Sequence, residues 1–74
     1  MYTVNLNLIR KKREEMNISK AEMARRIGLS YTEKYSRRES GMYEFQANEI
    51  PLLCDILNIP YKKIFKENNA KIAK

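Results

Sequence analysis

The sequence predicts an all-α fold, a compact domain of four to five short helices over residues 1–66 followed by a basic, flexible tail over residues 67–74. Apolar residues recur at spacings of three and four, and no segment shows the alternation of a strand. Residue types that tolerate left-handed backbone stand at the expected helix ends, and they are Asn17, Gly28, Gly41 and Asn58. Periodicity and end signals therefore agree on a helical domain.

The first helix is expected to begin after Asn5, which is a good N-cap, and to end near Asn17. Its buried stripe is made of Leu6, Ile9, Arg13 and Met16. Arg13 is the one charge on that stripe, and a buried charge needs a partner. Glu39, on the inward side of the third helix, is the expected partner.

Two S-x-x-E capping boxes, Ser19 with Glu22 and Ser30 with Glu33, indicate the starts of the second and third helices. Gly28 lies between them, so the two helices are joined by a tight turn. Thr32 is an alternative cap, and the third helix is therefore expected to begin anywhere from residue 31 to residue 33.

The third helix is expected to turn Tyr35 and Glu39 inward, since they are four residues apart. Its outward positions are then Thr32, Glu33, Ser36 and Arg37. A fourth helix is expected from about residue 49 to residue 57, with Asn48 as its cap and Pro51 in its first turn. Pro60 is expected to start a short fifth helix.

The net charge of +6 is concentrated in one part of the chain. Residues 10–38 hold ten basic and four acidic side chains, whereas the rest of the chain holds five of each. This distribution is what a phosphate-binding face on the first three helices requires. A solvated charged surface that arose by chance is the alternative interpretation.

The composition argues against an enzyme. The chain has no His, one Cys and two Gly, and it shows no metal-spaced cluster, nucleophile–base pair or phosphate-cradling loop. We therefore expect no cofactor, no metal and no small-molecule substrate. No stretch approaches the ~20 apolar residues of a membrane span, and the N-terminal charges follow the apolar part, unlike those of a secretory signal. A cytoplasmic protein in a bacterial host cell is expected.

From Leu8 to Phe65 the sequence resembles the Cro/repressor-type (XRE-like) helix-turn-helix domains of phages and bacteria. The resemblance rests on four short motifs in order, which are Arg13-Glu14-Glu15, Ser19-x-x-Glu22-Met23-Ala24, Ile27-Gly28-Leu29-Ser30 and Glu39-x-Gly41. Leu57-Asn58-Ile59 stands where the family usually has Leu-Gly-Val. The resemblance implies a lambda-repressor-like fold, a pair between Arg13 and Glu39, and a sequence-specific DNA-binding transcriptional regulator that puts its third helix in the major groove of an operator.

The resemblance also implies roles for individual side chains. Lys20 stands where the family contacts a phosphate, and Thr32, Glu33 and Arg37 stand where it reads bases. Lys34 and Arg38 are better interpreted as phosphate contacts, which set register without reading sequence. Ser36 is a further DNA-binding candidate because it is an outward residue of the third helix. Tyr31 is another, because one extra residue between Gly28 and Gly41 reshapes the start of that helix and leaves Tyr31 exposed.

The sequence departs from the family pattern in two further ways, and the second of them keeps another function open. Arg38 occupies a position that is usually apolar. The loop after Gly41 carries Glu44 and then Glu49, which would weaken phosphate binding, beside residues typical of protein contacts, which are Met42, Tyr43 and Phe45. The alternative is a phage modulator or antirepressor that has the same fold but binds a repressor protein. Ile59 and Tyr61 are candidates for a homodimer surface.

Overall fold

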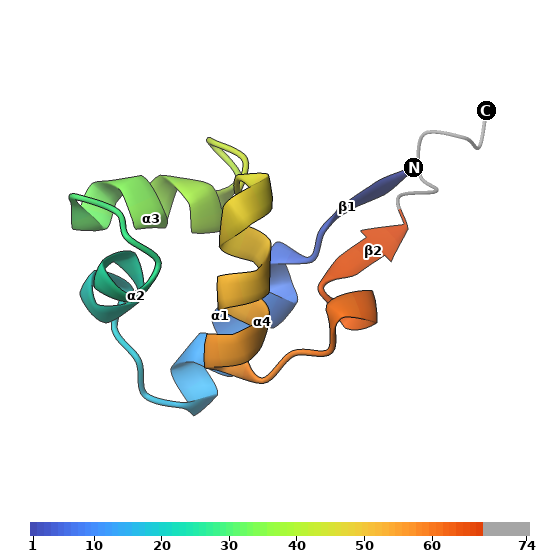
Figure 1. Ribbon diagram of the computed structural model, residues 1–74, viewed down its shortest axis with the longest axis horizontal. Coiled ribbons are helices and arrows are strands. Elements are labelled where there is room, and N and C mark those ends of the chain that lie inside the picture. The colour runs from blue at the N-terminus through green and yellow to red at the C-terminus, as the bar shows by residue number, and fades with distance from the viewer. Residues whose placement is uncertain (68–74) are drawn as a thin grey trace.

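The computed structural model describes residues 1–67 and packs four α-helices around an apolar core, with two short strands at one end (Figure 1). The α-helices are α1 (Leu6–Glu15), α2 (Lys20–Arg26), α3 (Thr32–Ser40) and α4 (Ile50–Leu57). Two 3-10 turns flank α4, which are η1 (Ala47–Glu49) and η2 (Tyr61–Lys63). The strands are β1 (Tyr2–Val4) and β2 (Phe65–Glu67). The compact, mainly helical architecture that the sequence predicts is confirmed.

The helix ends follow the predicted signals closely. Asn17, Gly28, Gly41 and Asn58 have φ angles of 58°, 84°, 91° and 55°, so all four adopt the left-handed conformation expected of them. At the helix starts, Asn5 Oδ1 accepts a hydrogen bond from the amide of Leu8 at 3.2 Å, and Ser19 Oγ accepts one from Glu22 at 3.0 Å. These caps satisfy amides that the first turn of a helix leaves without partners.

Three of the expected caps are wrong in detail. The N-cap of α3 is Tyr31, which makes no side-chain capping bond, so Ser30 and Glu33 do not form a capping box. The carboxylate of Glu22 binds Arg25 and Arg26, so only the hydroxyl half of the first box is present. Asn48 lies inside η1 and does not cap α4.

The two-stranded sheet is absent from the sequence prediction, because strands of three residues are too short to show alternation. Tyr2, Thr3 and Val4 pair antiparallel with Glu67, Lys66 and Phe65 respectively. Glu67, the first residue of the predicted tail, therefore belongs to a strand. The rest of the predicted tail, residues 68–74, lies outside the described residues. The expected fifth helix is the single 3-10 turn η2.

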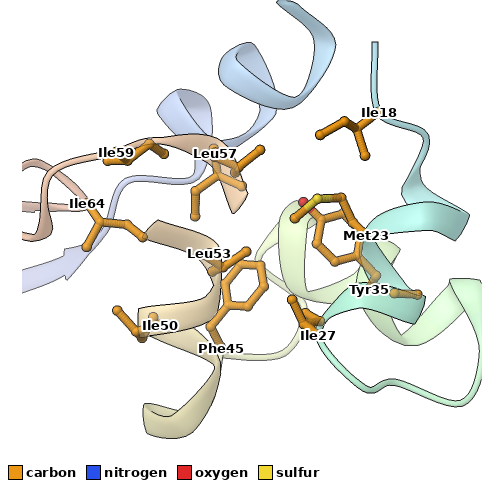
Figure 2. Close-up of a cluster of buried hydrophobic side chains, with 12 residues drawn as sticks. Ile18, Met23, Ile27, Tyr35, Phe45, Ile50, Leu53, Leu57, Ile59 and Ile64 are labelled. Carbon is orange, nitrogen blue, oxygen red and sulfur yellow. The ribbon is translucent and has the colours of Figure 1, made fainter. Parts of the chain in front are cut away.

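The core takes side chains from every α-helix and from the segment after α4 (Figure 2). Its largest fully buried members are Tyr35, Ile9, Met23, Leu53, Leu57 and Ile64. Ala24 is also buried where α2 packs on α3, and its small side chain permits that close approach. The predicted inward face of α3 is confirmed, since Tyr35 and Glu39 are its buried residues.

Two residues predicted to make protein contacts belong to this core, which corrects the prediction. Phe45 is 9% exposed, and its ring packs edge-on against Tyr35 with centroids 6.0 Å apart. Ile59 is 3% exposed, so it offers no dimer surface. Both side chains gain more from burial than from water contact, since apolar burial stabilises by about 25 cal/mol per Å².

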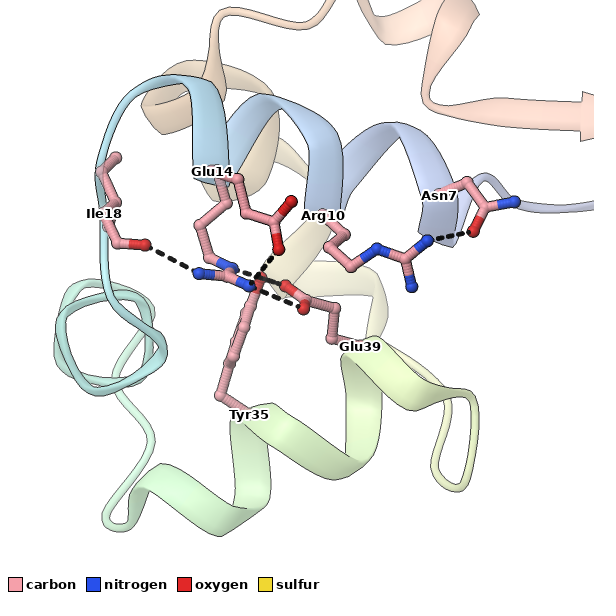
Figure 3. A network of polar contacts seen from close by, with 7 residues as sticks. Asn7, Arg10, Glu14, Ile18, Tyr35 and Glu39 are labelled. Carbon is pink, nitrogen blue, oxygen red and sulfur yellow. Dashed lines mark hydrogen bonds and ion pairs between the residues drawn. The ribbon is translucent and has the colours of Figure 1, made fainter.

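A buried ion pair fixes α3 on α1 (Figure 3). Arg13 Nε donates to Glu39 Oε2 at 2.8 Å, and Arg13 Nη2 donates to Glu39 Oε1 at 3.1 Å, which gives a bidentate contact. Arg13 Nη1 donates to the Ile18 carbonyl at 2.9 Å, and the Tyr35 hydroxyl donates to Glu39 Oε2 at 2.6 Å. The predicted pair is therefore present, and it also ties down the segment that leads into α2.

The network sets the protonation of its members. Burial alone would raise the pKa of the Glu39 carboxyl, but hydrogen bonds from Arg13 and Tyr35 outweigh burial and lower that pKa below its ordinary value of 4.5. Burial and the bond to Glu39 raise the pKa of the Tyr35 hydroxyl. Glu39 is therefore a carboxylate and Tyr35 a neutral donor at neutral pH.

We expect Glu39→Ala to lower the free energy of unfolding by about 3–5 kcal/mol, because it leaves Arg13 charged and unpaired in the core. A core of this size rarely supplies more than ~3–5 kcal/mol, so the variant should be largely unfolded at 25 °C. Urea denaturation followed by circular dichroism measures the change. Glu33→Ala, an exposed change on the same helix, should stay within about 0.5 kcal/mol. Similar midpoints for both variants would contradict a stabilising role of the buried pair.

Stability should also fall in acid, in a way that depends on Glu39. Because the pKa of Glu39 is lower in the folded state than in the unfolded state, its contribution is complete above about pH 4.5 and is lost as the pH falls through the folded value. The difference in free energy of unfolding between the parent and Glu39→Gln should therefore shrink as urea titrations move from pH 7 to pH 3. A constant difference over that interval would contradict the linkage.

Candidate nucleic-acid interface

The outward side of α3 gathers most of the residues predicted to bind DNA. Thr32, Glu33, Lys34 and Arg37 are exposed there, and Ser36 is half-buried. Their position follows from the other side of the helix, where Tyr35 and Glu39 are held in the core. A helix that holds two residues one turn apart against the core presents its opposite side to solvent. The predicted recognition side chains are thus on the accessible side of one element.

Lys20 is the first residue of α2, and it is exposed directly after the Ser19 cap. Its positive charge is near enough to the Glu39 carboxyl to help lower the pKa of that group. Glu39 lies on α3, and α2 packs on α3 in Figure 1. The start of α2 therefore brings a cation close to α3.

Arg38 was predicted to bind a phosphate, but its side chain does not face solvent. Its Nε donates to Glu49 Oε1 at 2.9 Å, and the Arg38 and Glu49 side chains are 11% and 8% exposed. Glu49 Oε1 also accepts from the amide of Gln46 at 2.9 Å, which stabilises the start of η1. The prediction that Arg38 binds a phosphate is therefore corrected, and so is the prediction that Glu49 repels one.

Ion pairs within the chain reduce the positive charge that is available to bind a partner. Of the ten basic side chains in residues 10–38, Arg13 and Arg38 are neutralised by acids from the second half of the chain. Arg25 and Arg26 both bind Glu22, and the contact with Arg26 is the main cause of the lowered pKa of that carboxyl. On α3 itself the exposed charges are Glu33, Lys34 and Arg37.

Aromatic rings accompany the two exposed cations of α3. The ammonium of Lys34 lies 5.8 Å from the ring centroid of Tyr31, and the guanidinium of Arg37 lies 6.0 Å from that of Tyr43. A ring at this distance attracts a cation and limits its motion. This support for Arg37 is absent from the sequence prediction. It arises because the Met42 and Tyr43 amides both donate to the Arg37 carbonyl in the turn after the helix, which brings Tyr43 back toward Arg37. Gly41 indicates in the sequence that the chain turns back after α3, so an aromatic residue soon after it can reach Arg37. The sequence does not show that Tyr43 is that residue.

The remaining candidates for protein contacts divide by exposure. Met42 and Tyr43 are exposed at the tip of the loop after α3, and Glu44 is exposed beside them. Tyr61 is exposed at η2 and packs edge-on against Phe65 with centroids 5.7 Å apart. The loop and η2 therefore retain surface aromatic groups, whereas Phe45 and Ile59 do not.

Other kinds of site find no support in the part of the chain that the structure describes. Residues 1–67 hold no group of three or more His, Cys, Asp or Glu side chains placed to bind a metal ion. None of their helices is both long enough and apolar enough to cross a bilayer. Cys54 is half-buried, and burial raises the pKa of its thiol, which favours the unreactive form.

Comparison with known proteins agrees with this geometry. A helix-turn-helix family model matches residues 9–64, which covers most of α1, all of α2, α3 and α4, and the turn η2. No curated protein matches the chain. The matched segment includes the buried Arg13–Glu39 pair and the whole exposed face of α3. The chain therefore belongs to the helix-turn-helix family of the XRE/Cro–C1 type, a non-enzymatic family of DNA-binding regulators.

Proposed function

We propose that this protein is a sequence-specific regulator of transcription that places α3 in the major groove of duplex DNA. The observation that carries the proposal is the outward face of α3, where hydrogen-bonding and cationic side chains are exposed on a helix whose inner face is fixed by the Arg13–Glu39 pair. In a helix-turn-helix, the second helix of the motif enters the groove and the first crosses the backbone. Here these are α3 and α2.

The side chains suit distinct tasks in that arrangement. Arg37 is suited to a bidentate contact with guanine, Glu33 to accepting a bond from the cytosine amino group, and Thr32 to contact with a thymine methyl group. Lys20 and Lys34 are suited to phosphates, which position the helix without specifying sequence. The stacking of Arg37 on Tyr43 supports a specific role for Arg37, because a restrained guanidinium loses less conformational freedom on binding.

The start of α3 gives Tyr31 a separate role. It is the N-cap and is exposed. The resemblance to the family implies one extra residue between Gly28 and Gly41 in this part of the chain. We infer that Tyr31 enters the groove beside the first turn of α3 and that Ser36 bonds to the backbone of one strand. Such a protein would act in the cytoplasm of a bacterial cell, on an operator of its host or of a phage.

A repressor-binding modulator with the same fold is the second candidate. The observation that favours it is the exposed pair Met42 and Tyr43 beside the acidic Glu44 at the tip of the loop. Two other observations count against it, because Phe45 is buried in the core and Glu49 is neutralised by Arg38. The modulator would ignore duplex DNA at low salt and co-purify with a repressor protein.

Binding to duplex DNA should weaken steeply as salt rises, because contacts with phosphates release counterions. Lys20→Ala and Lys34→Ala should each reduce the slope of log K against log salt by about 1 and weaken binding to all sequences alike. Lys62→Ala is the matched control, since Lys62 is an exposed cation on η2, and it should leave the slope unchanged. Band-shift titrations from low to physiological salt measure these slopes. Equal slopes for all three variants would contradict the proposed face.

Arg37→Ala should relax sequence preference rather than only weaken binding. Loss of a bidentate contact with guanine should cost about 1–3 kcal/mol at one base pair of the preferred site. Selection from a random duplex library, followed by binding to single-substitution sites, measures that preference for the parent and the variant. Lys34→Ala should keep the parent's base preferences. If Arg37→Ala kept them too, Arg37 would not be a base-reading residue.

A further inference from the structure

The two edges of the small sheet differ in chemistry. Within residues 1–67 the sheet consists of β1 and β2, so each strand has one edge that no third strand covers. The edge of β2 carries Lys66 and Glu67, whereas β1 has the uncharged sequence Tyr2-Thr3-Val4. Charged residues, Lys above all, protect an edge strand from pairing with another chain. The edge of β1 lacks that protection.

The hydrogen-bond alternation shows which backbone groups β1 presents. The Asn5 amide donates to the Ile64 carbonyl at 2.7 Å, in continuation of the β1–β2 register. Because bonded and non-bonded pairs alternate in an antiparallel ladder, Thr3 and Lys66 form the next bonded pair. The amides and carbonyls of Tyr2 and Val4 therefore point toward the outer edge.

A hollow of about 250 Å³ adjoins this edge. It lies between the strands and the loop after α3, and its apolar walls include Val4, Leu6, Phe45 and Phe65. Tyr2 and Tyr43 also line it and are 69% and 53% exposed, so the hollow has an aromatic rim. The size and lining of the hollow suit an aromatic side chain.

We propose that β1 pairs antiparallel with β1 of a second copy, about a two-fold axis at Thr3. Tyr2 then lies opposite Val4 of the second copy, and the two residues exchange the backbone hydrogen bonds that point outward. Thr3 lies opposite Thr3 of the second copy. Aromatic–β-branched pairs and Thr–Thr pairs are both favourable in antiparallel sheets. Opposite residues share a face, so Tyr2 of the second copy lies beside Val4 and covers the hollow.

A second copy fits this edge because the edge is complementary to itself. The same two-fold operation applied to β2 would set Lys66 against Lys66, which is destabilising. In Figure 1 the strands lie at the end of the molecule away from α2 and α3, so the pairing leaves the outward face of α3 free. The dimer does not depend on the proposed DNA binding, since it can be measured without nucleic acid.

Sedimentation velocity and light scattering of the full chain over a range of concentrations test the dimer. The parent should form a reversible dimer, and Thr3→Glu should sediment as a monomer at concentrations where the parent is dimeric. Within one copy the new carboxylate faces Lys66, so the β1–β2 sheet keeps a favourable pair, whereas across the axis it faces its own copy. Asn48→Glu adds the same charge at an exposed position outside the sheet and should remain dimeric.

A disulfide trap tests the register directly, in a Cys54→Ser background. Opposed non-bonded residues have Cα atoms about 4.5 Å apart, within the range that a disulfide spans. Thr3→Cys should therefore oxidise to a covalent dimer, and Lys66→Cys, its neighbour on β2, should not. A parent that stays monomeric at all concentrations would overturn the proposal, and so would a dimer that resists Thr3→Glu and forms no crosslink through Thr3→Cys. A parent protein that is dimeric but does not bind duplex DNA at low salt would overturn the proposed function and leave the proposed dimer intact.

Discussion

The contact between the Arg13 guanidinium and the Glu39 carboxylate is the constraint on which the rest of the structure depends. Each charge would be untenable in the core alone, and together they satisfy each other in a bidentate geometry that Tyr35 completes. The pair leaves α3 little freedom to rotate about its own axis, because Tyr35 and Glu39 must both face α1 and the core. This fixed orientation of α3 determines which of its residues face outward. A buried pair is weak support for net stability, but it specifies one orientation of α3 against the alternatives.

A second buried pair changes the electrostatic character of the surface. Arg38 would add a cation beside Arg37 if it faced water, but it binds Glu49 and links α3 to the start of α4. An acid that would oppose a phosphate is neutralised by the same contact. The outward face of α3 thus has few charges, and its two cations stand beside Tyr31 and Tyr43. Such a face is suited to discriminating between partners through a small number of directional contacts rather than through a large positive field.

The sequence predicted most of the helical framework because its signals are local. Asn17, Gly28, Gly41 and Asn58 report backbone conformation at single positions, and the spacing of Tyr35 and Glu39 reports one helix face. The features that it missed depend on residues distant in the chain. Nothing near Arg38 indicates that its partner is Glu49, and nothing near Tyr2 indicates pairing with Glu67. Phe45 and Ile59 were misassigned because a loop or a segment after a helix gives no periodicity from which burial can be inferred. The roles of the outward α3 residues in DNA recognition stay predictions.

The pairing of β1 with β2 has a consequence for how the molecule assembles. It joins the first described strand to the last, so its closure entropy is that of a loop containing all four helices. Contacts of such long sequence separation form late, after local helical structure has reduced the distance between the ends. During synthesis β1 emerges before β2, and in that interval its backbone is available to other nascent chains. A strand of three residues offers few backbone groups by itself, and the hollow that Val4, Leu6 and Phe45 line forms only when the helices have packed. Pairing through β1 is therefore weak in the nascent chain and is expected only between folded copies.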